Sequence, residues 1–216
     1  KAYTRAYNIE VLQNKHGVFI MEHLAVVADT VQKIIDIELT WKIDETGKII
    51  ASMEAQKDEE FPDLPRFGIR LFLDKKFEDV AYYGMGPHES YRDKHQATSH
   101  GIYRSKVTDL HEDYIRPQEN GSHYDCDYVE LTNAQYGFAI VSEDSFSFNA
   151  SYYTQEVLEQ TEHNFELEES DSTVLCVDYA LNGIGSNSCG PVVLDQYRFR
   201  ENEFRFQLKL VPYVKR

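Results

Sequence analysis

The sequence predicts an all-β protein made of two large packed antiparallel sheets with one short helix. Polar and apolar residues alternate through most of the 216 residues, and β-branched and aromatic side chains fill the alternating positions. Short polar turns separate these runs, and neither a βαβ alternation nor a glycine-rich phosphate loop occurs. About a dozen strands joined in this way bury their apolar sides by packing sheet against sheet.

Two turns between the runs suit hairpins. The first is D-E-T-G, in which Gly47 is free to adopt a positive φ, and the second is N-A-Q-Y-G at 133–137. The predicted strands, in chain order, are residues 6–12, 18–24, 25–29, 34–43, 49–55, 66–73, 79–85, 124–132, 138–142, 146–151, 173–181, 193–199 and 203–212.

Two segments depart from this pattern. Residues 154–160 (TQEVLEQ) predict a helix of at most two turns, because Thr154 suits its N-cap and Glu156 suits the dipole of its first turn. Residues 82–121 contain few strand runs, many polar residues and four of the eight histidines. A long polar excursion within a β protein is typical of a functional region or an interface.

Charge and cysteine content exclude several classes of protein. The net charge of −15 argues against nucleic acid and against an anionic membrane surface, both of which attract Lys and Arg. No apolar run approaches the length of a membrane span. The cysteines are three in number (Cys126, Cys176 and Cys189) and form no C-x-x-C motif, so we expect a reducing compartment, the cytoplasm, rather than disulfides or zinc.

The histidines of the polar segment are candidates for a metal site. His88, His95 and His100 are separated by seven and five residues, which matches neither H-x-x-x-H on a helix nor a zinc-finger spacing. We therefore expect them to stabilise loops or lie on the surface, and we expect no metal in this chain.

Several side chains are of the types that hydrolases use in catalysis, but they form no recognisable hydrolase motif. Glu89, Glu112, Asp113 and Glu119 offer pairs of carboxylates for glycoside hydrolysis, but any acidic protein contains such pairs. The thiol of Cys189 is a possible nucleophile for which the sequence shows no activating base. Residues 116–121 (RPQENG) read as a turn, in which Arg116 and Glu119 are placed to form a local ion pair.

Five motifs in a fixed order carry a family resemblance. They are LPRFGIRL at 64–71, YYGMGPHESY at 82–91, YIRPQENG at 114–121, SFNASYYTQEVL at 147–158 and NGIGSNSCGP at 182–191. Together they resemble the C-terminal domain of family-2 β-galactosidases, also called the β-galactosidase small chain. The match runs from about residue 64 to the end of the chain, with a looser match before it.

The resemblance implies a fold and a parent reaction. The fold is the β-supersandwich of galactose mutarotases, and the reaction is hydrolysis of terminal β-D-galactosides such as lactose with retention of configuration. In the family, both catalytic glutamates and the magnesium ligands lie in a central TIM barrel that this chain lacks. The resemblance therefore implies no catalytic residue and no cofactor in this chain, with magnesium belonging to the barrel.

The family's contribution to the active site lies in the last motif. Some members read G-I-G-G-D-D-S-W-x-P there, and their Trp forms part of a sugar platform at the mouth of the barrel. Here Cys189 takes that position and offers no comparable stacking surface. The resemblance implies that Ser186, Asn187, Ser188 and Cys189 form a substrate-contacting rim.

Two further motifs are implied to be structural. Loops 84–91 and 116–121 are expected to brace the architecture without touching the reacting atoms. Their motif residues are Gly84, Gly86, Pro87, Glu89, Arg116, Pro117, Glu119, Asn120 and Gly121.

The resemblance also implies partners. We expect a single domain over residues 1–216 that packs on the TIM-barrel part, supplied by the same chain or by a large subunit, in an oligomeric enzyme. Nothing here matches the family's earlier R-A-P-x-D-N-D-type motif, so we expect the chain to begin inside the domain, with exposed apolar surface near residues 2–12. Two alternatives stay open: an aldose 1-epimerase-type isomerase, and a stand-alone galactoside-binding module.

Overall fold

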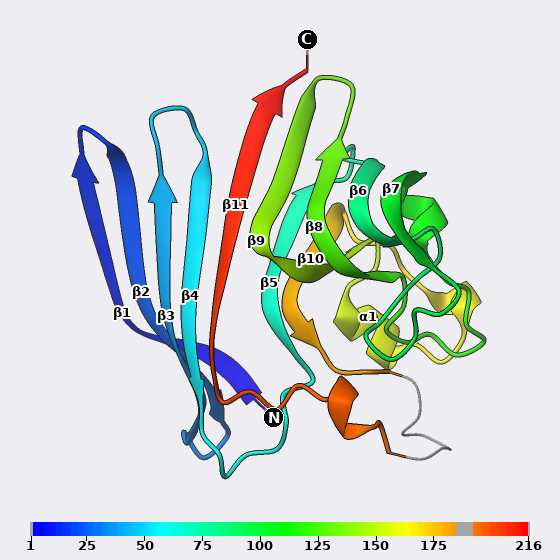
Figure 1. Cartoon of the computed structure of the whole chain (residues 1–216), viewed down its shortest axis with the longest axis horizontal. Helices are drawn as coiled ribbons and strands as arrows, with labels where there is room; N and C mark the ends of the chain where they lie inside the picture. The colour runs from blue at the N-terminus through cyan, green and yellow to red at the C-terminus, as the bar shows by residue number, and fades with distance from the viewer. Residues whose placement is uncertain (1, 185–191, 216) are drawn as a thin grey trace. The chain divides into compact units, whose positions relative to one another are not determined.

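The computed structural model describes residues 2–184 and 192–215, and its regular structure is mostly β-strand (Figure 1). No helix in these two ranges is long and apolar enough to cross a membrane. The described strands are β1 (Ala2–Asn14), β2 (Gly17–Ala28), β3 (Lys33–Ile43), β4 (Ile49–Lys57), β5 (Arg66–Asp74), β6 (Asp79–Gly86), β7 (Ser99–Lys106), β8 (Ser122–Thr132), β9 (Tyr136–Ser151), β10 (Ser172–Leu181) and β11 (Glu203–Val214). The described helices are α1 (Gln155–Gln160) and three 3₁₀ turns at Val107–Leu110, Asn164–Glu166 and Asp195–Tyr197.

The chain divides into two compact units, each described by itself. Unit 1 comprises the described residues of Lys1–Leu64, Ile140–Asp144 and Arg200–Pro212. Unit 2 comprises those of Pro65–Ala139, Ser145–Phe199 and Tyr213–Arg216. Strand β9 contributes its middle to unit 1 and its two ends to unit 2.

Unit 1 is a sheet in the order β1-β2-β3-β4-β11, and each neighbouring pair is antiparallel (Figure 1). The middle of β9 lies beside β11, where the Ser142 hydroxyl donates a hydrogen bond of 2.8 Å to the Gln207 carbonyl. One face is strongly apolar, with Leu39, Met53 and Phe206 almost fully buried. Burial of such side chains contributes about 1.5–3 kcal/mol each, which makes this face the main source of stability in unit 1.

Unit 2 consists of two runs of antiparallel strands that share β9: β9-β8-β6-β7 and β9-β10-β5. Its core is aromatic, because the ring of Tyr82 lies 5.1 Å from that of Phe148 and 4.4 Å from that of His123. Helix α1 begins after Thr154, whose hydroxyl accepts a hydrogen bond of 3.2 Å from the Val157 amide. This contact satisfies an amide that the first turn leaves unpaired.

These observations confirm an all-β, antiparallel fold with one short α-helix among the described residues. Both predicted hairpins are present. Gly47 has φ 82° in a turn closed by the Asp44 amide on the Lys48 carbonyl, and the side chain of Asn133 accepts hydrogen bonds from two amides of the second turn. The predicted N-cap and helix at 154–160 are also confirmed.

One predicted strand does not form, one strand was not predicted, and two strands were each predicted as two. Residues 193–199 contain a 3₁₀ turn at Asp195–Tyr197 rather than a strand, and the apolar side chains of Val192 and Leu194 are exposed. Strand β7 was not predicted, because its sequence SHGIYRSK has little apolar alternation and is mostly exposed. The two predicted strands at 18–24 and 25–29 are one strand, β2, and those at 138–142 and 146–151 are one strand, β9, which continues through the polar residues 143–145.

Candidate functional site

The predicted rim residues Ser186, Asn187, Ser188 and Cys189 lie outside the described residues. The chain on either side of them is held firmly. The Asn182 amide donates to the Pro65 carbonyl at 2.8 Å, and its side-chain oxygen accepts from the Phe199 amide at 2.7 Å. Asn182 therefore joins the two flanks of the loop and ties them to the start of β5.

The end of β6 requires two of the predicted motif glycines, Gly84 and Gly86, for reasons of space. A Cβ on Gly84 would lie 2.2 Å from the Cys126 sulfur, and one on Gly86 would lie 2.2 Å from the Tyr82 hydroxyl. The Gly86–Pro87 peptide bond is cis. Side chains at these two positions would collide with buried neighbours, so the glycines allow β6 to lie against β8 and against its own aromatic core.

Glu89 lies at the centre of a buried hydrogen-bond cluster. Its Oε1 accepts hydrogen bonds from the Lys94 ammonium and the Tyr114 hydroxyl, and its Oε2 accepts from the Gly121 amide at 2.8 Å. The Tyr91 hydroxyl lies 3.5 Å from the same Oε2. One carboxylate thus joins loop 84–91 to loop 114–121, the two motif loops that the sequence separates by more than twenty residues.

The hydrogen bonds also set the charge of Glu89. Burial alone raises the pKa of this carboxyl, but the hydrogen bonds from Lys94, Tyr114 and Gly121 outweigh burial and hold its pKa below the ordinary value. The same carboxylate raises the pKa of Lys94, although burial opposes this. Glu89 is therefore an ionised anchor.

Loop 116–121 is closed by its own side chains. The Asn120 side chain accepts a hydrogen bond from the Glu112 amide at 3.0 Å and donates one to the Gln118 carbonyl at 2.9 Å. Gly121 has φ 70°, a conformation that favours glycine. Pro117 is buried and Arg116 is exposed.

Glu119 pairs with a residue that lies far away in the sequence. The local ion pair considered for it, with Arg116, is replaced by one in which Arg66 Nη1 donates to Glu119 Oε2 at 3.0 Å. Arg66 is the first residue of β5, so this contact ties the loop to the sheet of unit 2. The second oxygen of Glu119, Oε1, is buried and has no hydrogen-bond partner among the described residues.

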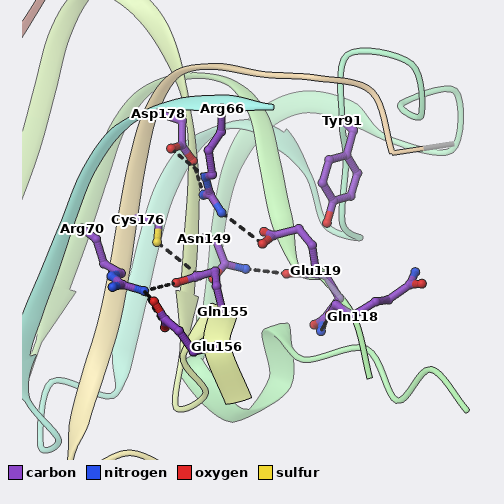
Figure 2. Close-up of polar contacts among 12 residues, drawn as sticks. Arg66, Arg70, Tyr91, Gln118, Glu119, Asn149, Gln155, Glu156, Cys176 and Asp178 are labelled. Atoms are coloured by element: carbon purple, nitrogen blue, oxygen red, sulfur yellow. Dashed lines mark hydrogen bonds and ion pairs between the residues drawn. The ribbon is translucent and has the colours of Figure 1, made fainter. Parts of the chain in front are cut away.

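Arg66 also binds Asp178 of β10 at two points (Figure 2). Nε donates to Oδ1 at 3.1 Å and Nη2 to Oδ2 at 2.5 Å, which is the fork geometry that arginine and carboxylate prefer. Burial raises the pKa of both Asp178 and Glu119, and the charge of Arg66 only partly offsets it. The cluster holds one cation between two carboxyl groups whose negative charge burial disfavours.

A second group of polar contacts lies beside this cluster on α1 and the neighbouring strands (Figure 2). Arg70 Nη1 donates to Gln155 Oε1 at 2.9 Å and pairs with Glu156 at 2.8 Å. Gln155 donates in turn to the Cys176 sulfur at 3.3 Å. These contacts dock the short helix on β5 and β10. A pocket of about 360 Å³ opens next to the helix and is lined by Arg116, Pro117, Gln118, Glu119, Gln155, Leu158 and Glu159.

The histidines of the polar segment lie apart in different local contacts. His95 Nδ1 lies 3.1 Å from the Tyr91 carbonyl, His100 Nε2 lies 3.0 Å from the Asp125 carbonyl, and His88 is exposed. In ranges 2–184 and 192–215, no three His, Cys, Asp or Glu side chains are grouped so that they could hold a metal ion. Cys126 and Cys176 are free, buried thiols.

The sequence places Arg66 in the motif LPRFGIRL, but its ion pair with Asp178 was not predicted. A signal for Asp178 was present, because an acidic residue within the apolar run VLCVDYA has to find a partner if the strand is buried. The identity of that partner depends on the pairing of β10 with β5, which no local pattern reveals.

A family model and three curated relatives all match this chain to β-galactosidases. The family model described as β-galactosidase small chain matches residues 2–210. A β-galactosidase from Actinobacillus pleuropneumoniae is 44% identical over 211 residues, which are 98% of this chain and 21% of that protein. β-Galactosidases from Staphylococcus xylosus and Kluyveromyces lactis are 40% and 30% identical over 96% and 95% of this chain, again 21% of each protein.

Among solved structures, the chain is similar to the GalM/aldose epimerase homologue from C. elegans, with a TM-score of 0.45 and 10% sequence identity. The similarity covers 96% of this chain and 68% of that one.

Proposed function

This chain belongs to the β-galactosidase small-chain family, and on that premise we propose that it is a non-catalytic domain of an enzyme that hydrolyses terminal β-D-galactosides such as lactose. The chain spans about one fifth of the length of the curated relatives it matches. The chemistry then belongs to the remaining four fifths, the TIM-barrel part, which is also where we place the magnesium.

The observation that carries this proposal is the near-complete match over residues 2–210 to a family found within much longer β-galactosidases. The geometry of the motif carboxylates supports it. Glu89 is hydrogen-bonded by three groups from two loops, and Glu119 is bound by Arg66. A retaining glycosidase needs two carboxyl groups that face a substrate, whereas these two hold the chain together.

The proposal gives the domain two tasks. It packs on the catalytic part, in the same polypeptide or as a separate subunit of an oligomer, and it presents Ser186, Asn187, Ser188 and Cys189 at the rim of the active site. Support for the second task is the anchoring of both flanks of that loop through Asn182. A cytoplasmic location is also part of the proposal, and the free thiols of Cys126 and Cys176 support it.

A domain replacement tests the proposal. The matching fifth of the A. pleuropneumoniae enzyme is replaced by this chain, and hydrolysis of a chromogenic β-galactoside is measured beside a version lacking that fifth. We expect the chimera to be active and the shortened enzyme to be inactive. Full activity of the shortened enzyme would contradict the proposal. Galactose mutarotation by this chain alone would favour the isomerase, and calorimetric binding of lactose to it would favour the binding module.

A further inference from the structure

A tight turn follows the motif loop 84–91. The Tyr91 amide donates a hydrogen bond of 2.8 Å to the Lys94 carbonyl, and the Lys94 amide donates one of 2.9 Å to the Tyr91 carbonyl. These two backbone hydrogen bonds close the turn. They place Arg92 and Asp93 at its tip, where both side chains can reach other segments of unit 2.

The base of this turn is fixed by the hydrogen-bond cluster around Glu89. The side chain of Tyr91 is almost fully buried, and its hydroxyl lies 3.5 Å from Glu89 Oε2. The Lys94 ammonium binds Glu89 Oε1 and also lies 2.9 Å from the Tyr114 hydroxyl. Both ends of the turn are thus bound to one carboxylate, and a satisfied buried network of this kind makes the turn rigid.

Asp93 lies against one flank of the rim loop. The rim loop contains the predicted substrate-contacting residues 186–189, and its described flanks are residues 182–184 and 192–199. A Cβ on Gly183 would lie 2.4 Å from both Cγ and Oδ2 of Asp93 and 2.8 Å from its Oδ1. Distances this short leave no room for a side chain at position 183. Glycine there allows the Asp93 carboxylate to pack directly on the backbone of the first flank.

Arg92 contacts the second flank. Its Nη1 donates a hydrogen bond of 3.4 Å to the Arg198 carbonyl. The next residue, Phe199, is almost fully buried, and its amide is the group that donates to the Asn182 side chain. Two neighbouring residues at the tip of one turn therefore contact both flanks, each at a position next to the hydrogen bond that joins them.

We propose that Arg92 and Asp93 are positioning residues for galactoside binding. The turn at 91–94, held at its base by Glu89, sets where the two flanks lie, and the flanks set where the rim residues meet the substrate. Arg92 and Asp93 act through the flanks and not on the substrate itself. The inference rests on the proposed function, because that function is what brings the rim loop to the substrate.

Kinetics of the full-length chimera test the inference. Asp93→Ala should raise KM for a chromogenic β-galactoside at least about threefold and leave kcat within about twofold, because a displaced rim loses contacts that the substrate and the transition state share. Arg92→Met should act in the same direction. A merely structural role would give the other pattern, since poor folding reduces the amount of active enzyme and lowers the apparent kcat at an unchanged KM.

Two further variants serve as controls. Asp93→Asn keeps the shape of the side chain against Gly183 and should raise KM less than Asp93→Ala does. Asp109→Ala removes an exposed aspartate from the 3₁₀ turn at Val107–Leu110, also in unit 2, and should change neither constant. An unchanged KM for Asp93→Ala, or an equal rise for Asp109→Ala, would overturn the inference.

A double-mutant cycle tests the contact itself. Gly183→Ala should raise KM, because the added methyl group and the Asp93 carboxylate cannot both keep their places. In the Asp93→Ala background the three nearest atoms are gone, so the same substitution should raise KM by a factor at least about threefold smaller. Fully additive effects on KM would contradict coupling between the turn and the flank.

The outcomes separate this inference from the proposed function. An active chimera beside an inactive shortened enzyme, with a KM that does not respond to Asp93→Ala, would refute the inference and leave the proposed function standing. Full activity of the shortened enzyme would refute the proposed function and, with it, the inference.

Discussion

Arg66 and Asp178 form a two-point ion pair between β5 and β10, with Nε 3.1 Å from Oδ1 and Nη2 2.5 Å from Oδ2. The third donor of the same guanidinium, Nη1, reaches Glu119 in the loop that carries R-P-Q-E-N-G. A single side chain thus joins two strands and a motif loop. The arrangement ties the loop to the sheet of unit 2.

Replacing Arg66 should destabilise the fold strongly. Arg66→Met leaves the carboxyl of Asp178 buried without its counter-ion, which typically costs about 3–5 kcal/mol of unfolding free energy. The control is Arg70→Met, which removes the more exposed ion pair with Glu156 and should cost about 0–1 kcal/mol. Urea unfolding followed by circular dichroism measures both. Similar costs for the two variants would show that the buried pair contributes no more than the surface pair.

The carboxyl of Glu89 should contribute stability that depends on pH. Its pKa is held below its ordinary value of 4.5 by the hydrogen bonds from Lys94, Tyr114 and Gly121, which outweigh burial. A depressed pKa stabilises the folded state above pH 4.5, and this contribution is lost as pH falls through the folded-state value. Glu89→Gln should therefore cost about 1–3 kcal/mol at neutral pH and progressively less in acid. A cost that does not change with pH would contradict an ionised Glu89.

Glu119 should show the opposite dependence. Burial raises its pKa above 4.5, and the charge of Arg66 does not fully compensate. A raised pKa means that the folded state favours the protonated acid, so its contribution is present at low pH and is lost as pH rises through the folded-state value. Relative to the native chain, Glu119→Gln should become more stable between acid and neutral pH. Parallel pH profiles for Glu89→Gln and Glu119→Gln in chemical unfolding would refute this assignment.

How far the sequence predicts this structure depends on how local each feature is. The turn at Gly47 and the cap at Thr154 were predictable, because each needs only a residue type and its neighbours. The ion-pair partners of the motif-loop residues were harder to predict from the sequence. Glu119 had a nearby cation in Arg116, yet it binds Arg66, 53 positions away, because strand pairing brings β5 to the loop. The alternation in 193–199 predicted a strand, but a 3₁₀ turn forms there.

Gly121 should tolerate substitution less well than Gly47, although both have positive φ angles of 70° and 82°. Nothing lies within 4 Å of a Cβ placed on Gly47, so Gly47→Ala should cost only the conformational strain, about 1–2 kcal/mol. A Cβ on Gly121 would lie 2.3 Å from the Leu110 carbonyl oxygen, and its amide binds Glu89. Gly121→Ala should therefore cost about 2 kcal/mol more than Gly47→Ala, measured by urea unfolding. Equal costs would mean that the loop shifts freely.

Cys189 tests the proposed role of the rim loop in substrate binding. The residue lies outside the described residues, and the family resemblance of the motif at 182–191 implies that some members carry Trp at this position. An indole packed on the apolar face of a sugar gains about 0.5–1.5 kcal/mol, which corresponds to a two- to tenfold change in affinity. In the full-length chimera, Cys189→Trp should lower KM for a β-galactoside by that factor and leave kcat within about twofold. The control is Val192→Trp, because Val192 is 61% exposed and follows the loop. An unchanged KM for Cys189→Trp, or an equal change for both variants, would show that substrate does not contact this position.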